Sequence, residues 1–227
     1  MPAPGPVAHL VGERLACRRG ERLVFAGLSF RLAAGDALLL TGANGSGKSS
    51  LLRLVAGLLP PAAGRLSWGA APVAADPAAH HARLHYVGHL DALKPAMTPR
   101  ETLVFWVGLR GCRRPRPELA VDQSLAAFGL DAIADWPCRW LSAGQRRRVA
   151  LARLVAAPAP LWLLDEPTSA LDQDGQQRLE EAIAAHRGAG GMVMLATHMP
   201  VALDAAAALA LDGFAASLDH ADSEIVG

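Results

Sequence analysis

The chain has 227 residues, which suits one domain with a subdomain, or at most two small domains. Its 52 % hydrophobic and 19 % charged residues are typical of a globular protein rather than a disordered one. The 22 Lys and Arg residues nearly balance the 21 Asp and Glu residues. The net charge of +1 creates no long-range field that would gather nucleic acid or an anionic membrane, so any anion binding must be local.

Three further features of the sequence indicate where the protein is located. Residues 1–6 have neither a basic start nor an apolar run, so we expect no signal peptide. No stretch of ~18 uncharged apolar residues is present, so we expect no membrane span. The cysteines are odd in number and scattered (Cys17, Cys112 and Cys138), which indicates reduced thiols in the cytoplasm.

The first third of the chain alternates short apolar runs with turn signals. This pattern predicts strands over 7–15, 23–25, 28–32 and 37–40. A helix over about 48–56 follows and ends at Gly57, with two prolines just beyond. Residues 60–90 are rich in Ala, Pro and Gly and favour strands and loops at one edge of the fold.

Helices dominate from Thr98 onward. Thr98 and Glu101 form a capping box with a proline at the first helical position, which predicts a helix to about residue 108. A basic loop over 111–117 leads to a second helix near 118–128, and a third helix begins at Ser142.

After Pro158 the chain returns to strand–helix alternation. We expect strands over 161–164, 192–196 and near 209–211, and helices over about 174–187 and 200–207. Repeated strand–helix–strand order predicts a parallel sheet covered on both faces, with the helices of 98–155 as an inserted subdomain.

Residues 42–49 match a phosphate-binding pattern. Gly42-Ala43-Asn44-Gly45-Ser46-Gly47-Lys48-Ser49 fits G-x-x-x-x-G-K-[ST] between a predicted buried strand and a predicted helix, the context that this pattern requires. The glycines let backbone N–H groups turn inward as an anion nest, and the positive helix end adds to its field. We expect Lys48 to reach the β- and γ-phosphates and Ser49 to hold Mg²⁺. The alternative is a Gly-rich turn that fits by accident.

The choice of lysine at position 48 supports the phosphate site. Lys48 and Lys94 are the only lysines of the chain, whose other basic residues are arginines and histidines. A compact ammonium fits inside a tight loop, whereas the broad guanidinium of arginine does not.

Two carboxylates follow the predicted strand 161–164. Because ligands of a parallel sheet bind at the carboxyl ends of its strands, Asp165 and Glu166 would face the phosphates. We expect Asp165 to bind Mg²⁺, directly or through water, and Glu166 to orient and polarise the attacking water. His198 follows the strand 192–196 and could bond the γ-phosphate. The alternatives are an acidic turn and a histidine without a chemical role.

A second anion site is predicted at the start of the third helix. Ser142 and Gln145 form a Ser-x-x-Gln capping box, so the simplest interpretation is a well-capped helix. Gly144 would also allow close backbone approach, and Ser142 would supply a hydroxyl to an anion. The inserted subdomain places this segment too far from its own phosphate loop, so it would serve the nucleotide of another copy.

Together these residues carry a resemblance to a known family. The stretches Gly42–Ser49, Leu141–Gln145, Leu161–Glu166 and Ser169–Asp172, with His198, occur in the order and context of ABC transporter nucleotide-binding domains. The resemblance covers almost the whole chain. It implies a RecA-like α/β P-loop NTPase core with an N-terminal antiparallel β subdomain (together 1–97 and 157–227) and an inserted α-helical subdomain (98–156).

The family also implies a mode of action. Two copies would pair head to tail and enclose two ATP molecules, each between one phosphate loop, extended to Ser50, and the partner's Ser142, Gly144 and Gln145. Asp172 would couple the two sites across the interface. Each ATP would be hydrolysed to ADP and phosphate to drive integral membrane subunits.

A narrower resemblance is to the haem exporter ATPases of cytochrome c maturation. It is carried by Gly27–Phe30, Tyr86–His89, Leu90–Lys94 and the arginine-rich Leu141–Leu154. It implies peripheral attachment to the cytoplasmic face of the inner membrane, haem-handling partners and no nucleic acid. Hydrolysis would power haem export or release haem from a carrier protein.

The chain departs from the family pattern at two places. Leu90 falls about where the family has a glutamine that contacts Mg²⁺ and water, and a leucine cannot ligate a cation. Either His89 or Asp91 replaces that glutamine, or coupling to the membrane partner is altered. Near Arg19 the family commonly stacks an aromatic ring on adenine; a guanidinium can stack there at about 1 kcal/mol, which would loosen nucleotide selectivity.

Two clusters have simple interpretations. Because 85–88 is strand-like, the group His80, His81, His85 and His89 does not share a helical face, and we expect surface or loop histidines; a ligand role is the alternative. The basic run from Arg110 to Arg116 is expected to be a solvated loop, with contact to lipid headgroups as the alternative.

Two other functions stay open. The chain could serve a different ABC transporter, or, given Leu90, it could be a non-hydrolysing module that dimerises on nucleotide binding. An ATPase of DNA repair or translation is disfavoured, because it would need a long coiled-coil insert or a second ATPase domain.

Overall fold

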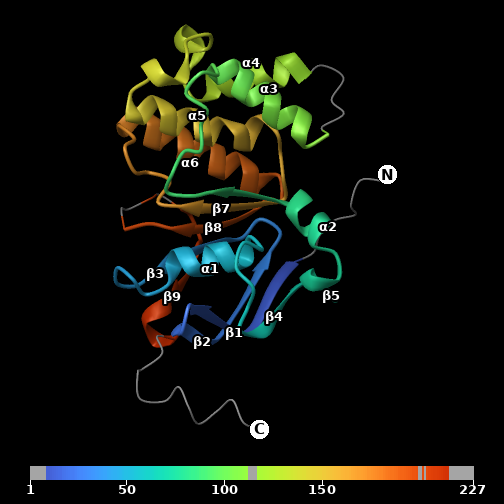
Figure 1. The fold of residues 1–227 in the computed structure, drawn as a ribbon. Coiled ribbons are helices and arrows are strands. Elements are labelled where there is room, and N and C mark those ends of the chain that lie inside the picture. The colour runs from blue at the N-terminus through green and yellow to red at the C-terminus, as the bar shows by residue number, and fades with distance from the viewer. Residues whose placement is uncertain (1–8, 112–116, 199–200, 202, 215–227) are drawn as a thin grey trace.

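We describe the protein from a computed structural model, in which residues 9–111, 117–198, 201 and 203–214 are described. The described chain contains two β-sheets with helices between and above them (Figure 1). The antiparallel sheet has the order β2-β1-β4-β5 and contains β1 (His9–Arg19), β2 (Arg22–Ala33), β4 (Ala63–Trp68) and β5 (Ala71–Pro72).

The second sheet is parallel throughout and has the order β6-β7-β8-β3-β9. Its strands are β3 (Ala37–Thr41), β6 (Leu84–Val87), β7 (Leu161–Asp165), β8 (Met192–Ala196) and β9 (Ala207–Ala210). Every residue of β7 and β8 is buried, as expected for central strands covered on both faces. Together the two sheets confirm the predicted α/β core with an antiparallel β region.

Helices cover both faces of the parallel sheet (Figure 1). Helix α1 (Lys48–Val55) lies between the two sheets and contacts β1, β7 and β8. On the other side α6 packs against β8, and α5 packs against α6, α3 and α4. These helices are α3 (Pro99–Leu109), α4 (Pro117–Ala127), α5 (Ala143–Ala156) and α6 (Gln173–Gly188); a short α2 spans Pro77–Ala82.

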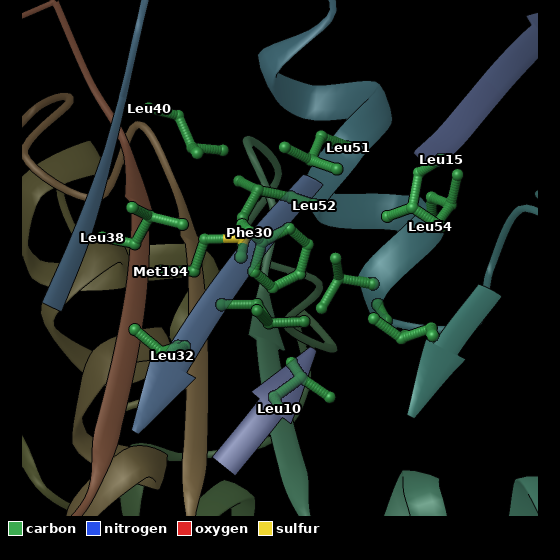
Figure 2. Close-up of a cluster of buried hydrophobic side chains, with 14 of the residues drawn as sticks. Leu10, Leu15, Phe30, Leu32, Leu38, Leu40, Leu51, Leu52, Leu54 and Met194 are labelled. Carbon is green, nitrogen blue, oxygen red and sulfur yellow. The ribbon is translucent and has the colours of Figure 1, made fainter. Parts of the chain in front are cut away.

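Two apolar cores hold these layers together. In the first, Leu10, Phe30 and Leu32 of the antiparallel sheet face the leucines of α1 and of the parallel sheet (Figure 2). The second lies between the parallel sheet and α3–α6 and includes Phe128, Leu151 and Leu164. Helix α1 packs against both sheets, so the phosphate loop that precedes it is attached to a closely packed and rigid element.

Some predicted elements were wrong. The stretches 23–25 and 28–32 form one strand, β2, which pairs with β1 through a bulged register despite the left-handed φ of 71° at Gly27. The predicted helix over 200–207 is not helical at Val201 or at residues 203–206, and Ala207 already pairs in β9. Helix α2 was missed although its signals are local: Asp76 caps it by accepting from the Ala79 N–H at 2.9 Å, and Pro77 starts it. Residues 112–116 of the basic loop lie outside the described chain.

The two predicted capping boxes are confirmed. Thr98 and Glu101 exchange both capping bonds at the start of α3, and Ser142 and Gln145 do the same at α5. None of the helices in the described part of the chain has the length and apolar character needed to cross a bilayer.

A stacked pair of rings predicts a pH dependence of stability. The ring of His186 lies flat on Trp162, with centroids 3.9 Å apart and an interplanar angle of 4°, and Nε2 donates to the Met192 carbonyl at 3.3 Å. Burial lowers the pKa of His186 to about 4, against about 6.5 in the unfolded chain. Between these values the unfolded chain binds the extra proton, so stability is full above pH 6.5 and falls as the pH drops toward 4.

We therefore expect His186→Phe, which keeps a stacked ring, to weaken the pH dependence. The difference in unfolding free energy between pH 7 and pH 4 should shrink by about 3 kcal/mol. Urea titrations of both proteins at the two pH values measure it. An undiminished difference in the variant would show that His186 is not the titrating group.

Candidate functional site

The predicted phosphate loop joins β3 to α1, and its glycines are needed for its shape. Gly42, Gly45 and Gly47 have φ values of 132°, 84° and 106°, a region that other residues rarely adopt. A Cβ atom on Gly47 would lie 2.8 Å from Val24 Cγ1 in the antiparallel sheet. Gly47 has no side chain to cap α1, so the first N–H groups of that helix remain available to an anion.

The loop borders a cavity of about 440 Å³. Asn44, Gly45 and the stretch Gly47–Ser50 line it, together with Arg19, Arg22, Val24 and Glu166. Lys48 Nζ donates to the carbonyls of Gly42 and Ala43 at 2.7 and 2.9 Å. Ser46 Oγ is buried and has no hydrogen-bond partner within the described chain. The volume, the exposed helix end and the ammonium fit a bound phosphate chain.

Beside the cavity, Ser49 meets the first predicted carboxylate. Ser49 Oγ donates to Asp165 Oδ1 at 2.9 Å, and Asp165 is buried at the end of β7. Tyr86 OH donates to the other carboxylate oxygen at 3.4 Å. Burial raises the pKa of the Tyr86 phenol, so it is a neutral donor at neutral pH. A hydroxyl and a carboxylate oxygen side by side are the hard ligands that Mg²⁺ takes when phosphates complete its shell.

The second carboxylate, Glu166, is held by the neighbouring strand. Its backbone N–H donates to the Ala196 carbonyl at 2.8 Å, and its φ of 49° is left-handed. Glu166 Oε2 accepts from His198 Nδ1 at 2.9 Å and from the His198 backbone N–H at 3.3 Å. The structure thus joins two residues that lie 32 positions apart in sequence, and Glu166 also lines the phosphate cavity.

The predicted second anion site lies elsewhere. Ser142, Gly144, Gln145 and Asp172 are not among the residues that line the phosphate cavity, and α5 lies on the opposite side of the parallel sheet from α1 (Figure 1). A Cβ atom on Gly144 would lie 2.7 Å from the Ala170 carbonyl oxygen, so this glycine allows α5 to approach the loop before α6. Asp172 caps α6 by accepting from the Gly175 N–H at 2.9 Å. None of these four residues borders the phosphate cavity of its own copy.

Three residues around the site were missed or undervalued in the sequence. Arg22 lines the cavity beside Arg19, because the two pair across the hairpin between β1 and β2. Asp212 accepts from the Ala43 N–H at 3.1 Å and so braces the phosphate loop from the C-terminal side. Tyr86 appeared in the sequence analysis only as part of a stretch that carries the family resemblance. The basic turn at 18–22 could have indicated Arg22. No local pattern could have indicated Asp212, which lies 169 positions from its partner Ala43.

The segment around Leu90 does not supply an obvious replacement for glutamine. Leu90 is 80 % exposed and His89 is exposed. Asp91 Oδ1 accepts from Arg147 Nη1 at 3.2 Å, so this carboxylate is paired with a buried guanidinium.

The expectation of surface histidines is wrong for two of the four. His80 is buried, and both of its ring nitrogens have partners: Trp68 Nε1 donates to Nδ1 at 2.9 Å, and Nε2 donates to the Val55 carbonyl at 2.8 Å. His85 is buried against the Ala157 carbonyl and Arg110. Within the described chain no group of three or more His, Cys, Asp and Glu residues could hold a metal ion.

Comparison with known proteins agrees with this geometry. The family model described as ABC transporter matches residues 25–169. The chain is 61 % identical over 212 residues to the cytochrome c biogenesis ATP-binding export protein CcmA of Rhodospirillum rubrum, covering 93 % of this chain and 89 % of the relative. It is 56 % identical to the protein of the same name from Paramagnetospirillum magneticum, covering 89 % and 94 %.

Solved structures share the fold. An ABC transporter ATP-binding protein of Pyrococcus furiosus superposes with a TM-score of 0.79 at 18 % identity, covering 92 % of this chain and 100 % of that chain. The ATP-binding subunit of another ABC transporter superposes with a TM-score of 0.77 at 23 % identity, covering 84 % and 79 %.

Proposed function

The chain belongs to the ABC transporter family, and on that premise we propose that it hydrolyses ATP to power a membrane complex of cytochrome c biogenesis. One observation carries the hydrolytic part. Asp165 and the Glu166–His198 pair lie at or just after the carboxyl ends of two adjacent strands, β7 and β8, and Asp165 bonds Ser49 at the start of α1. The names of the relatives support the biogenesis part.

The residues divide the binding of ATP between them. Backbone N–H groups of the loop and of the start of α1 hold the phosphates, and Lys48 exchanges its bonds to Gly42 and Ala43 for the β- and γ-phosphate oxygens. Ser49 and Asp165 would hold Mg²⁺, which, when bound, neutralises charge on these oxygens. Arg19 and Arg22 face the cavity, where a guanidinium can stack on the base.

Hydrolysis then depends on the placement of one water molecule. Glu166 Oε1 or Oε2 accepts a proton from the water as its oxygen attacks the γ-phosphorus, and the bond to the β-phosphate oxygen breaks to give ADP and phosphate. His198 fixes the Glu166 carboxylate through two hydrogen bonds and can reach the γ-phosphate from the same side.

The site requires a second copy to be complete. Ser142, Gly144 and Gln145 lie at the N-terminus of α5 and do not line the cavity of their own loop. They would bind the γ-phosphate held by a partner arranged head to tail. Asp172 lies next to this surface and would couple the two nucleotides. We also propose the predicted boundaries, with 98–156 as the helical subdomain and 1–97 and 157–227 as the remainder.

The complex needs partners that this chain lacks. We propose integral membrane subunits, haem-handling proteins and attachment at the cytoplasmic face of the inner membrane, with no nucleic acid. The test is complementation of a bacterium that lacks its own CcmA. The wild-type chain should restore covalent haem in c-type cytochromes, measured by haem staining, and Glu166→Gln should not. Restored ATP turnover in membranes without c-type cytochromes would point to a different transporter instead.

A further inference from the structure

Arg147 is the most completely bonded buried charge near the site. The residue is 2 % exposed, and its guanidinium donates to four backbone carbonyls and one carboxylate. Nε donates to the Pro167 carbonyl at 3.1 Å, and Nη2 donates to the carbonyls of Asp165 and Glu166 at 3.1 and 2.7 Å. Nη1 donates to the Gly88 carbonyl at 2.8 Å and to Asp91 Oδ1 at 3.2 Å.

These five bonds use the full donor capacity of the side chain. A guanidinium carries five N–H groups in a rigid fork, and a lysine ammonium carries three without that fork. The three consecutive carbonyls of Asp165, Glu166 and Pro167 all point at one side chain. Arginine is therefore the residue that can fix this turn.

The turn fixed by Arg147 carries the proposed general base. Glu166 adopts a left-handed backbone, which a residue with a side chain keeps only where its surroundings hold it. Two main-chain bonds hold it from outside the turn: its N–H donates to Ala196 and its carbonyl accepts from Arg147. Loss of the second would leave the Glu166 carbonyl with only the Ser169 N–H of its own turn, at 3.2 Å, and would loosen the peptide that carries the carboxylate.

Arg147 also joins two other parts of the molecule to that turn. It lies on the second turn of α5, one turn from Ser142 and Gly144, which are proposed to meet the partner's nucleotide. Through Gly88 and Asp91 it holds the segment where leucine stands in place of the usual glutamine. A shift of α5 would therefore reach Glu166 and this segment through a single side chain.

We propose that Arg147 is a positioning residue for ATP hydrolysis, which holds the Glu166 backbone in its active geometry and links it to the start of α5. The proposal rests on the proposed role of Glu166. Arg147 does not line the phosphate cavity, so its loss should lower kcat and leave KM for ATP unchanged.

A second buried arginine on the same helix provides a matched control. Arg153 is also buried, donates to the Tyr86 carbonyl and lies 4.5 Å from the Trp106 ring centroid. Arg153→Gln removes another buried guanidinium from α5 without touching the Glu166 turn. Any loss of activity that follows from loss of stability alone should track the fall in melting temperature in both variants.

The experiment measures kcat, KM and melting temperature for the full chain and its variants. We expect Arg147→Gln to lower kcat by about 10²-fold, since misplacement of a reacting group by about 1 Å has that effect. Arg153→Gln should keep the wild-type kcat at temperatures below its own melting transition. Arg147→Lys, which keeps the charge but has three donors in place of five, should lower kcat by about 10-fold.

A double variant tests the route through Glu166. If Arg147 acts only by placing that carboxylate, Arg147→Gln should have little further effect in the Glu166→Gln background. Wild-type kcat in Arg147→Gln or Arg147→Lys, or equal losses in Arg147→Gln and Arg153→Gln, would overturn the proposal. The Glu166→Gln variant tests the hydrolytic function separately from the role of Arg147. Equal turnover in wild type and Glu166→Gln would overturn the hydrolytic function itself.

Discussion

Replacement of Glu166 by glutamine should lower ATP turnover by about 10²–10⁴-fold and leave nucleotide binding intact. The amide has nearly the same shape and can still accept the hydrogen bond from the His198 N–H, so the fold around β7 is expected to persist. It cannot take a proton from the attacking water, which is the loss that slows the reaction. Steady-state phosphate release and equilibrium binding of ATP in the purified complex measure the two effects.

Glu181→Gln is the matched control, because it removes an exposed carboxylate on α6 and should turn over ATP like the wild type. Equal rates in Glu166→Gln and wild type would contradict the assignment of Glu166. A wild-type complex that binds ATP, dimerises and releases no phosphate would favour the non-hydrolysing module that Leu90 first suggested.

Replacement of Lys48 by alanine should remove most of the affinity for ATP. Its ammonium lies within a loop that otherwise offers only neutral donors, and truncation of one member of a desolvated charge pair costs about 2–5 kcal/mol, or roughly 30- to 4,000-fold in affinity. Lys48→Arg should rescue little, since the loop that Gly42 and Ala43 form around the ammonium is too tight for a guanidinium. Isothermal titration with ATP in the presence of Mg²⁺ measures the change.

Lys94→Ala supplies the control for net charge, because Lys94 is the other lysine of the chain and is exposed. Its affinity for ATP should equal that of the wild type. If both variants bind equally well, the phosphate site does not lie at the loop. If Lys48→Ala alone has a lowered melting temperature without ATP, the lysine is structural.

Local patterns predicted much of this molecule. The phosphate loop, the capping boxes of α3 and α5 and the buried strands β7 and β8 each depend on residues adjacent in sequence, so a pattern of residue types was enough to place them. The sequence predicted a parallel sheet but not the order of its strands. The position of β3 between β8 and β9 depends on contacts between distant segments, which no local pattern encodes.

Residues that act over long sequence distances could not be found this way. Arg147 looked like one member of a basic cluster, and only the packing of α5 against the turn after β7 shows that it is buried. His80 and His85 looked solvated because their partners, Trp68, Val55 and Ala157, come from other elements. The predicted helix over 200–207 failed because the chain turns at Asp204 and Ala205, where Ala205 has a left-handed φ of 52°, before β9 begins at Ala207.

The claim on which the rest depends is that ATP joins two copies of this chain, each completing the site of the other. Light scattering of the Glu166→Gln protein with and without Mg²⁺ and ATP tests it most directly, because this variant should hold the nucleotide without consuming it. We expect the mass to double when ATP is added, and Lys48→Ala introduced into the same protein to abolish the change. A single-copy mass in both conditions, also when the membrane subunits are present, would contradict the shared site.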